Sequence, residues 1–202
     1  MTEVGHSVVF AAVEGVLDEV VLRRLLADVG ARPAAVYGKQ GKQRLRERIG
    51  DYNNASRHGR WVVIVDLDTD DECAPSLRRH WLARPAPGMC FRVAVHEIES
   101  WLLADRAAFS RFMGIPLVRV PLRPDGEKDP KRAIVDLARA SRYGAISEDM
   151  VPRPGACRDV GPAYTSRLAE FAGANWRPDE AARNSDSLAR CIRRLAEMVA
   201  AR

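Results

Sequence analysis

Short apolar runs alternate with amphipathic stretches through the first half of the chain. Apolar runs typical of buried strands occupy residues 7–13, 34–37, 61–65 and 89–95. Apolar positions recur with helical spacing in residues 17–30, in the basic segment 38–59 after an opening loop, in 77–83 and in 96–115. Strands that alternate with helices predict an α/β fold with a mainly parallel sheet flanked by helices.

The last third of the chain has a weaker pattern. Residues 116–124 are rich in proline and predict irregular structure. A helix is predicted over 130–141, because Asp129 suits the capping position and Pro130 the first helical position. An amphipathic helix is predicted over 185–202, with Ser185 or Asp186 as its cap. We expect residues 1–115 to form an α/β core and residues 116–202 a helical or irregular extension packed on it, within one structural domain.

Composition and charge narrow the class of protein. No apolar run approaches the ~18 residues that a membrane-spanning helix needs, and the N-terminus lacks the basic region of a signal peptide. The four cysteines form no CxxC pair, which favours reduced thiols in a cytoplasmic protein over disulfides or a zinc site. The formal net charge is +5, with basic residues gathered in 38–50 and near the C-terminus. This distribution favours a polyanionic partner such as nucleic acid.

A row of carboxylates follows the third apolar run, in VVIVDLDTDD (residues 62–71). Carboxylates this close repel one another unless water solvates them or a cation lies among them. Asp66 and Asp68 are the expected ligands, provided that the chain is still extended there. Glu14 follows the first run at the same edge of the predicted sheet and is expected either to complete the metal shell or to act as general base for the attacking water. Oxygen ligands of this kind suit Mg²⁺ or Mn²⁺. Asp70 and Asp71 are expected to cap the next helix or to face solvent.

These segments resemble the Toprim domain shared by topoisomerases, bacterial primases, OLD-type nucleases and a ribosomal-RNA maturase. The resemblance lies in a strand ending in VEG (13–15), a helix beginning LDEVVLRRLL (17–26) and a strand ending in DLD (66–68), and it covers about residues 5–105. It places the family glutamate on Glu14 and the aspartate pair on Asp66 and Asp68. It implies a Rossmann-like fold, Mg²⁺ or Mn²⁺, and phosphodiester chemistry on nucleic acid. VAVHEIESWLLAD (93–105) is similar to an uncharacterised group of small stand-alone Toprim-like proteins, some found near phage-defence genes.

Further residues are candidates for the same site. Glu97 and Glu99 follow the fourth apolar run and are expected either to hold a second metal ion or to stabilise a helix N-terminus. Gly15 leaves room for a phosphate or metal ion beside Glu14. Lysines in two glycine-containing segments are candidates for phosphate binding: Lys39 and Lys42 in GKQGKQ, and Lys128 and Lys131 in GEKDPKRA.

Together these features favour a magnesium-dependent phosphodiesterase that acts on DNA or RNA. The chain contains no ATPase domain, zinc finger or candidate nucleophilic tyrosine, so topoisomerase and primase activities are not expected. One alternative is a non-catalytic Toprim-like scaffold that binds nucleic acid or a partner protein, such as an ATPase subunit, in a defence system. A phosphatase that acts on a small substrate is the second alternative.

Overall fold

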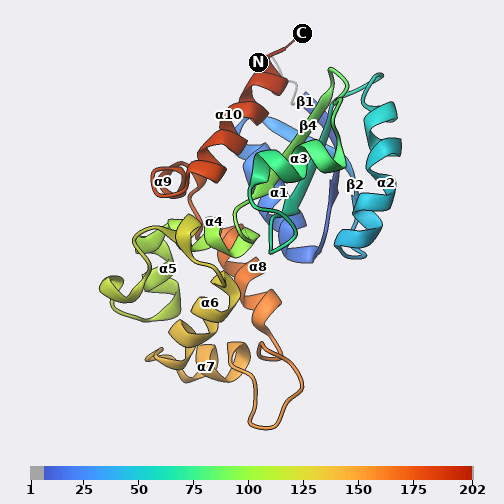
Figure 1. Ribbon diagram of the computed structural model, residues 1–202. Coiled ribbons are helices and arrows are strands. Elements are labelled where there is room, and N and C mark those ends of the chain that lie inside the picture. Colours follow the sequence, from blue (N-terminus) through green and yellow to red (C-terminus); the bar gives the residue numbers. More distant parts are fainter. Residues whose placement is uncertain (1–6, 202) are drawn as a thin grey trace, which may run out of the picture. The chain divides into compact units, whose positions relative to one another are not determined.

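The computed structural model describes residues 7–201, and the chain divides into two compact units. Unit 1 contains the residues up to Ala94 together with those from Arg190 onward, and unit 2 contains Val95–Ala189. Figure 1 shows unit 1 mainly in blue and green, with its C-terminal part in red. The boundary therefore falls at Ala94 and not at the expected residue 115, because the apolar segment after Ala94 forms part of a second core.

Unit 1 contains a parallel sheet with helices around it. Its elements are β1 (Ser7–Val13), α1 (Val16–Asp28), β2 (Ala31–Gly38), α2 (Lys42–Ala55), β3 (Trp61–Asp66), α3 (Ala74–Trp81), β4 (Met89–Ala94) and the end of α10 (Asp186–Ala200). Among the described residues the sheet has four strands in the order β2-β1-β3-β4, and every pair of neighbours is parallel. The predicted α/β class with a mainly parallel sheet is confirmed.

The central strand β3 is apolar because both of its faces are covered. Its residues from Trp61 to Val65 are all buried, as expected for a parallel sheet with helices on both sides. Trp61 pairs with Phe10 of β1 on one side and with Met89 of β4 on the other. Right-handed crossovers in this strand order place α1 on one face and α2 and α3 on the other.

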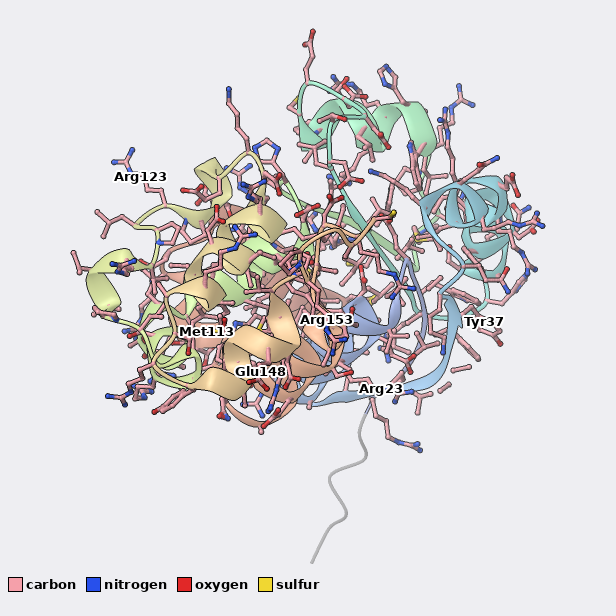
Figure 2. All side chains as sticks on the ribbon, turned by 90° about the horizontal axis from the view of Figure 1, so that it is seen from below. Arg23, Tyr37, Met113, Arg123, Glu148 and Arg153 are labelled. Atoms are coloured by element: carbon pink, nitrogen blue, oxygen red, sulfur yellow. The ribbon has the colours of Figure 1, made fainter. Side chains whose placement is uncertain are left out.

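Aromatic side chains pack α2 onto the sheet. The Trp61 ring stacks with Phe10, Tyr37 and Tyr52 at centroid distances of 5.3, 5.5 and 5.2 Å. Tyr52 belongs to α2, and Tyr37 belongs to the edge strand β2, where 43% of it remains exposed. Figure 2 labels Tyr37 at the margin of unit 1. This cluster fixes the helix that carries Lys42 against the strands that carry the carboxylates.

The part of α10 that belongs to unit 1 packs on the same face of the sheet as α1. Side chains alternate between faces along a strand, so Phe91 and Arg92 of β4 point in opposite directions. Phe91 stacks against Trp81 of α3 with ring centroids 5.9 Å apart. Arg92 instead meets Cys191 of α10, so the part of α10 in unit 1 lies on the face opposite α3.

Unit 2 is helical. Its elements are α4 (Ile98–Ala104), α5 (Arg106–Met113), the short 3₁₀ helices η1 (Leu117–Arg119) and η2 (Pro124–Gly126), α6 (Pro130–Arg139), α7 (Gly144–Met150), α8 (Tyr164–Ala174), α9 (Pro178–Ala182) and the start of α10. Every residue of α4 is buried. The core around it includes Trp101, Phe109, Phe171 and Trp176.

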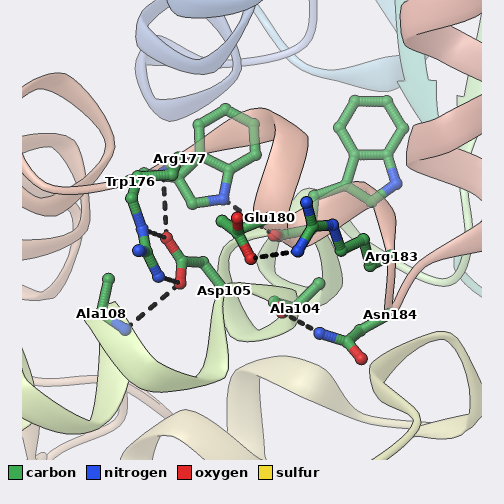
Figure 3. Close-up of polar contacts among 9 residues, drawn as sticks. Ala104, Asp105, Ala108, Trp176, Arg177, Glu180, Arg183 and Asn184 are labelled. Carbon is green, nitrogen blue, oxygen red and sulfur yellow. Dashed lines mark hydrogen bonds and ion pairs between the residues drawn. The ribbon is translucent and has the colours of Figure 1, made fainter.

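A buried carboxylate joins α5 to the chain that precedes α9. Asp105 is 1% exposed and accepts a hydrogen bond from the backbone N–H of Ala108 at the start of α5. It also accepts hydrogen bonds from the backbone N–H of Arg177 at 3.0 Å and from its guanidinium at 2.9 and 2.6 Å. Figure 3 shows these contacts. Such a bidentate pair holds two segments of unit 2 in a single register.

The helices of unit 2 were only partly predicted. The Asp129 carboxylate accepts from the Arg132 N–H at 2.8 Å, and the Ser185 hydroxyl accepts from the Leu188 N–H at 3.2 Å, so both predicted caps are confirmed. Helices α7, α8 and α9 were not predicted, because glycine and proline near their ends obscure their periodicity. Their apolar residues, such as Phe171, are buried in unit 2, and this packing stabilises short helices of weak local pattern.

Within residues 7–201, none of the helices has the length and apolar character required to cross a bilayer. The prediction that the N-terminus is not a signal peptide rests partly on the first six residues, which lie outside the described residues.

Candidate functional site

Adjacent strands bring Glu14 and Asp66 together. β1 and β3 are parallel neighbours, Glu14 directly follows β1, and Asp66 is the last residue of β3. The Oε1 atom of Glu14 accepts a 2.7 Å hydrogen bond from the backbone N–H of Asp66. β2 lies on one side of β1 and β3 on the other, so this pair marks the point at which strand order reverses and ligands commonly bind.

Asp68 lies in a turn and not in an extension of β3. The strand ends at Asp66, although the N–H of Leu67 still donates to the carbonyl oxygen of Ala94 at 2.9 Å. Asp68 then takes a left-handed φ of 49°, which aspartate tolerates better than most residues. The extended geometry expected to direct Asp66 and Asp68 toward one ion is therefore wrong, because the chain turns after Leu67.

Lys42 is the main partner of the carboxylates in this turn. Its ammonium lies 2.8 Å from Asp68 Oδ2, 2.8 Å from Asp70 Oδ2 and 3.3 Å from the carbonyl oxygen of Leu67. Burial lowers the pKa of Lys42, but the hydrogen bonds that its ammonium donates to Asp68 and Asp70 outweigh this effect and leave the pKa above its ordinary value. Asp70 thus pairs with Lys42 while its side chain remains exposed to solvent, which agrees with the solvent-facing position expected for it.

The environment of Glu14 favours its protonated form. Burial raises its pKa from 4.5 to about 7, against the lowering effects of the Asp66 N–H and the Lys42 ammonium. The negative charges of Asp18 and Asp68 raise it further. A carboxyl group with a pKa near neutrality exchanges protons readily at physiological pH, which is the property required of a general base.

Asp18 is a site residue that the sequence analysis missed. It is 6% exposed in the first turn of α1, and a Cβ atom added at Gly15 would lie 3.1 Å from its Oδ2 atom. Gly15 therefore allows Asp18 to approach the end of β1. Gly15 is also the N-cap of α1, and no side chain caps this helix. The sequence did carry a signal for this residue, because Asp18 follows Glu14 by four residues, the length of about one helical turn.

The loop between β2 and α2 is tied to the end of β1. The N–H of Lys39 donates to the carbonyl oxygen of Val13 at 2.9 Å, and the N–H of Gly41 donates to that of Glu14 at 3.1 Å. The Lys39 ammonium lies 2.8 Å from Glu19 Oε2, and this contact contributes most to lowering the pKa of Glu19. Lys39 and Lys42 therefore lie at the carboxylate edge of the sheet, as expected.

The other four candidates, Glu97, Glu99, Lys128 and Lys131, belong to unit 2. Glu97 accepts hydrogen bonds from the backbone N–H of Lys131 at 3.1 Å and from its ammonium at 3.0 Å, at the first turn of α6. Glu99 is 4% exposed and accepts a 3.4 Å hydrogen bond from the Tyr164 hydroxyl. Burial raises the pKa of this hydroxyl, and the charge of Glu99 adds to the effect. Lys128 lies between η2 and α6. Glu97 thus stabilises a helix N-terminus, although not that of its own helix.

The donor chemistry of the carboxylate edge suits a hard cation. In residues 7–201, no group of three or more His, Cys, Asp and Glu side chains is arranged to hold a metal ion as it stands. Glu14, Asp66 and Asp68 nevertheless supply only oxygen atoms, the type of ligand that Mg²⁺ and Mn²⁺ prefer. Burial is the largest cause of the raised pKa of Glu14, and a bound cation would act against it by favouring the ionised carboxylate. The chemistry of these residues therefore fits a divalent cation. The positive charge next to Asp68 and Asp70 comes from the ammonium group of Lys42.

An open cleft of about 720 Å³ adjoins this edge in unit 1. Its lining residues are Lys42, Gln43, Arg46, Glu47, Asp70 and Trp81. Two of them, Lys42 and Asp70, also belong to the ion-paired cluster.

Comparisons with family models, curated proteins and solved structures gave no match to this chain. The Toprim-like character of the chain therefore remains an expectation from its sequence.

Proposed function

We propose that this chain is a magnesium- or manganese-dependent phosphodiesterase that acts on nucleic acid. The observation that carries the proposal is the 2.7 Å hydrogen bond between Glu14 Oε1 and the Asp66 N–H, at the carboxyl ends of two adjacent parallel strands. This bond holds the Glu14 carboxylate beside the backbone of Asp66, and Asp68 lies in the turn that follows. This arrangement supports a Toprim-like site, which the order of these acids along the chain first suggested.

In this proposal each acid has its own task. Asp66 and Asp68 hold the divalent cation. When bound, the cation polarises a phosphoryl oxygen and offsets the negative charge that develops in the transition state. Glu14 accepts the proton of the attacking water at its carboxylate, because a base with a pKa of about 7 is half ionised near neutral pH. Lys39 and Lys42 contact backbone phosphates, which positions the strand without reading its sequence.

One observation favours the alternative of a non-catalytic scaffold. Lys42 already neutralises Asp68 and Asp70 at 2.8 Å, and Lys39 pairs with Glu19 at 2.8 Å. Acids that are compensated within the chain do not require a cation. In that case the same edge binds nucleic acid or a partner protein, such as an ATPase subunit, and cleaves nothing.

A cleavage assay with a matched control separates these functions. The protein and the Asp66→Asn variant are incubated with single- and double-stranded DNA and RNA in Mg²⁺ and in Mn²⁺. The phosphodiesterase proposal expects metal-dependent cleavage that Asp66→Asn reduces by orders of magnitude, because the substitution keeps the size of the side chain and removes its charge. The exposed Glu72→Gln removes one charge from the same loop and should leave the rate unchanged.

The remaining outcomes identify the alternatives. Cleavage that persists in Asp66→Asn would contradict the assignment of this site. Tight binding of nucleic acid by an intact protein that cleaves none of these polymers would support the scaffold. Hydrolysis of a small phosphomonoester without cleavage of any polymer would support a phosphatase.

A further inference from the structure

We propose that the cleft beside Lys42 is a subsite for one unstacked nucleobase and its phosphate, so that the preferred polymer is single-stranded. This inference rests on the proposed function, because it specifies the form of substrate that the same site takes. The cleft, of about 720 Å³, lies within the range of ligand pockets, roughly 300–1,000 Å³. It is lined by the first turns of α2, by the end of α3 and by Asp70.

The Trp81 ring is the first feature that suits a base. Trp81 lines the cleft and is partly exposed, whereas the other three tryptophans of the chain, Trp61, Trp101 and Trp176, are buried. Its indole stacks with the buried Phe91 at a centroid distance of 5.9 Å and an interplanar angle of 25°. The ring is therefore held in one orientation at the surface of the cleft. Bases of any sequence stack on such a platform, because every base has a π-face.

Arg46 is the second feature. Its Cζ atom lies 5.9 Å from the centroid of the Trp81 ring, at the outer limit of about 6 Å for a cation–π contact. A base that stacks on the indole can replace this weak contact, and the guanidinium is then available to a phosphate, which it binds through two parallel hydrogen bonds. Gln43 and Glu47, joined by a 3.2 Å hydrogen bond, add polar groups to the cleft for the edge of a base.

The position of the cleft connects it to the carboxylates. Lys42 lines the cleft and lies 2.8 Å from both Asp68 and Asp70. A nucleotide whose base lies against Trp81 therefore brings its phosphate beside Lys42, at the edge of the proposed catalytic cluster. In a duplex the base is stacked and paired, and it would have to leave the helix before it could enter the cleft. The geometry thus favours single strands or unpaired ends.

The test measures binding without divalent cations, so that no cleavage interferes. The ligands are a short oligodeoxyadenylate, an abasic strand of the same length and the corresponding duplex. We expect the base-bearing strand to bind more tightly than the other two and to quench the tryptophan fluorescence. Trp81→Leu should remove this quenching and weaken binding of the base-bearing strand by about 5- to 150-fold, while binding of the abasic strand stays unchanged. Trp81→Phe, which keeps an aromatic face, should lose much less affinity.

Two arginine variants separate the phosphate from the base. Arg46→Gln should weaken binding of the base-bearing and abasic strands alike. Arg57→Gln, which removes one charge from an exposed position outside the cleft, should change neither. Circular dichroism shows whether each variant is folded, and Trp81→Phe and Arg46→Gln still test the subsite if Trp81→Leu does not fold.

The outcomes distinguish this subsite from the catalytic proposal. If Trp81→Leu loses affinity for the base-bearing strand alone and the unmutated protein cleaves nothing, the subsite stands and the proposed reaction falls. If the unmutated protein cleaves nucleic acid, and Trp81→Leu binds and cleaves it equally well, the proposed reaction stands and the proposed subsite is overturned. Equal affinity for the single strand and the duplex would also overturn it.

Discussion

The Oε1 atom of Glu14 accepts a 2.7 Å hydrogen bond from the backbone N–H of Asp66, so that one carboxylate joins the ends of β1 and β3. The bond favours the ionised form of Glu14, whereas burial favours the protonated form and has the larger effect, which gives a pKa of about 7. The backbone of Asp66 thus holds the Glu14 carboxylate in position, while burial makes the ionised form of this carboxylate less favourable than it is in water. Several consequences of this balance can be measured.

Stability should depend on pH through Glu14. Its pKa is 4.5 in an ordinary environment and about 7 in the folded chain, so between these values the folded state holds a proton that the unfolded state has released. Stability should therefore fall as the pH rises through this interval, by up to about 3 kcal/mol. Glu14→Gln should remove this dependence and be more stable than the unmutated chain at about pH 8, by roughly 1–3 kcal/mol.

Urea unfolding without divalent cations, at about pH 5 and about pH 8, measures this difference. Glu72→Gln, at an exposed position, serves as the control and should leave the pH dependence as it is. A Glu14→Gln variant that is destabilised equally at both pH values would show that the charge on Glu14 has no such cost.

Binding of a divalent cation should release a proton from Glu14. A cation at Asp66 and Asp68 would favour the ionised form of the neighbouring Glu14 carboxyl, so affinity for Mn²⁺ should rise with pH up to about 7, the pKa of Glu14, and level off above it. Calorimetric titration in buffers of different ionisation enthalpy counts the protons released. In Glu14→Gln the release should disappear. If proton release is the same in Glu14→Gln and in the unmutated protein, another group is responsible.

Lys42 should compete with a cation for Asp68 and Asp70. Its ammonium lies 2.8 Å from both carboxylates, so Lys42→Met leaves two negative charges uncompensated. Affinity for Mn²⁺ should then increase roughly tenfold, because a positive charge at this distance is removed. The matched variant is Lys39→Met, whose ammonium pairs with Glu19, and it should have a smaller effect. A lower affinity in Lys42→Met would mean that the lysine supports the cation site.

Binding of nucleic acid should weaken as salt concentration increases. Each phosphate contact that is lost reduces the slope of log affinity against log salt by about 0.7–0.9. The double variant Lys39→Ala/Lys42→Ala should therefore reduce it by about 1.4–1.8, measured by fluorescence anisotropy over a series of salt concentrations. An unchanged slope would exclude these lysines from the binding edge. The arginines of α2 are expected to contribute in the same way.

Asp105 should be a major determinant of the stability of unit 2. The carboxylate is 1% exposed and accepts hydrogen bonds from Ala108 and Arg177. Asp105→Ala should destabilise the protein by about 3 kcal/mol, because backbone and guanidinium donors lose a buried partner. Asp136→Ala removes ion pairs at the surface, where Asp136 is 52% exposed, and should cost less than about 1 kcal/mol. Thermal unfolding compares the two, and equal effects would contradict this role of Asp105.

Much of unit 1 was determined by local sequence pattern. The run from Ser7 to Val13 is a strand over its predicted length, and the strand that begins at Trp61 extends only one residue further than predicted. These strands are recognisable because both faces are covered and nearly every position must be apolar. β2 is longer than its apolar run, because an edge strand is held by backbone hydrogen bonds to one neighbour and its side chains can remain polar or exposed.

The sequence by itself also determined which acids lie at the carboxylate edge, because Glu14 and Asp66 directly follow strands whose ends must meet in a parallel sheet. Only the tertiary structure decided how the side chains are used. It turned the chain at Asp68, directed Lys42 to Asp68 and Asp70, and brought Asp18 beside Gly15. The positions of the strands along the chain follow from local hydrophobic patterns, whereas the adjacency of β1 and β3, the ion pairs and the pKa values depend on residues far apart in the chain.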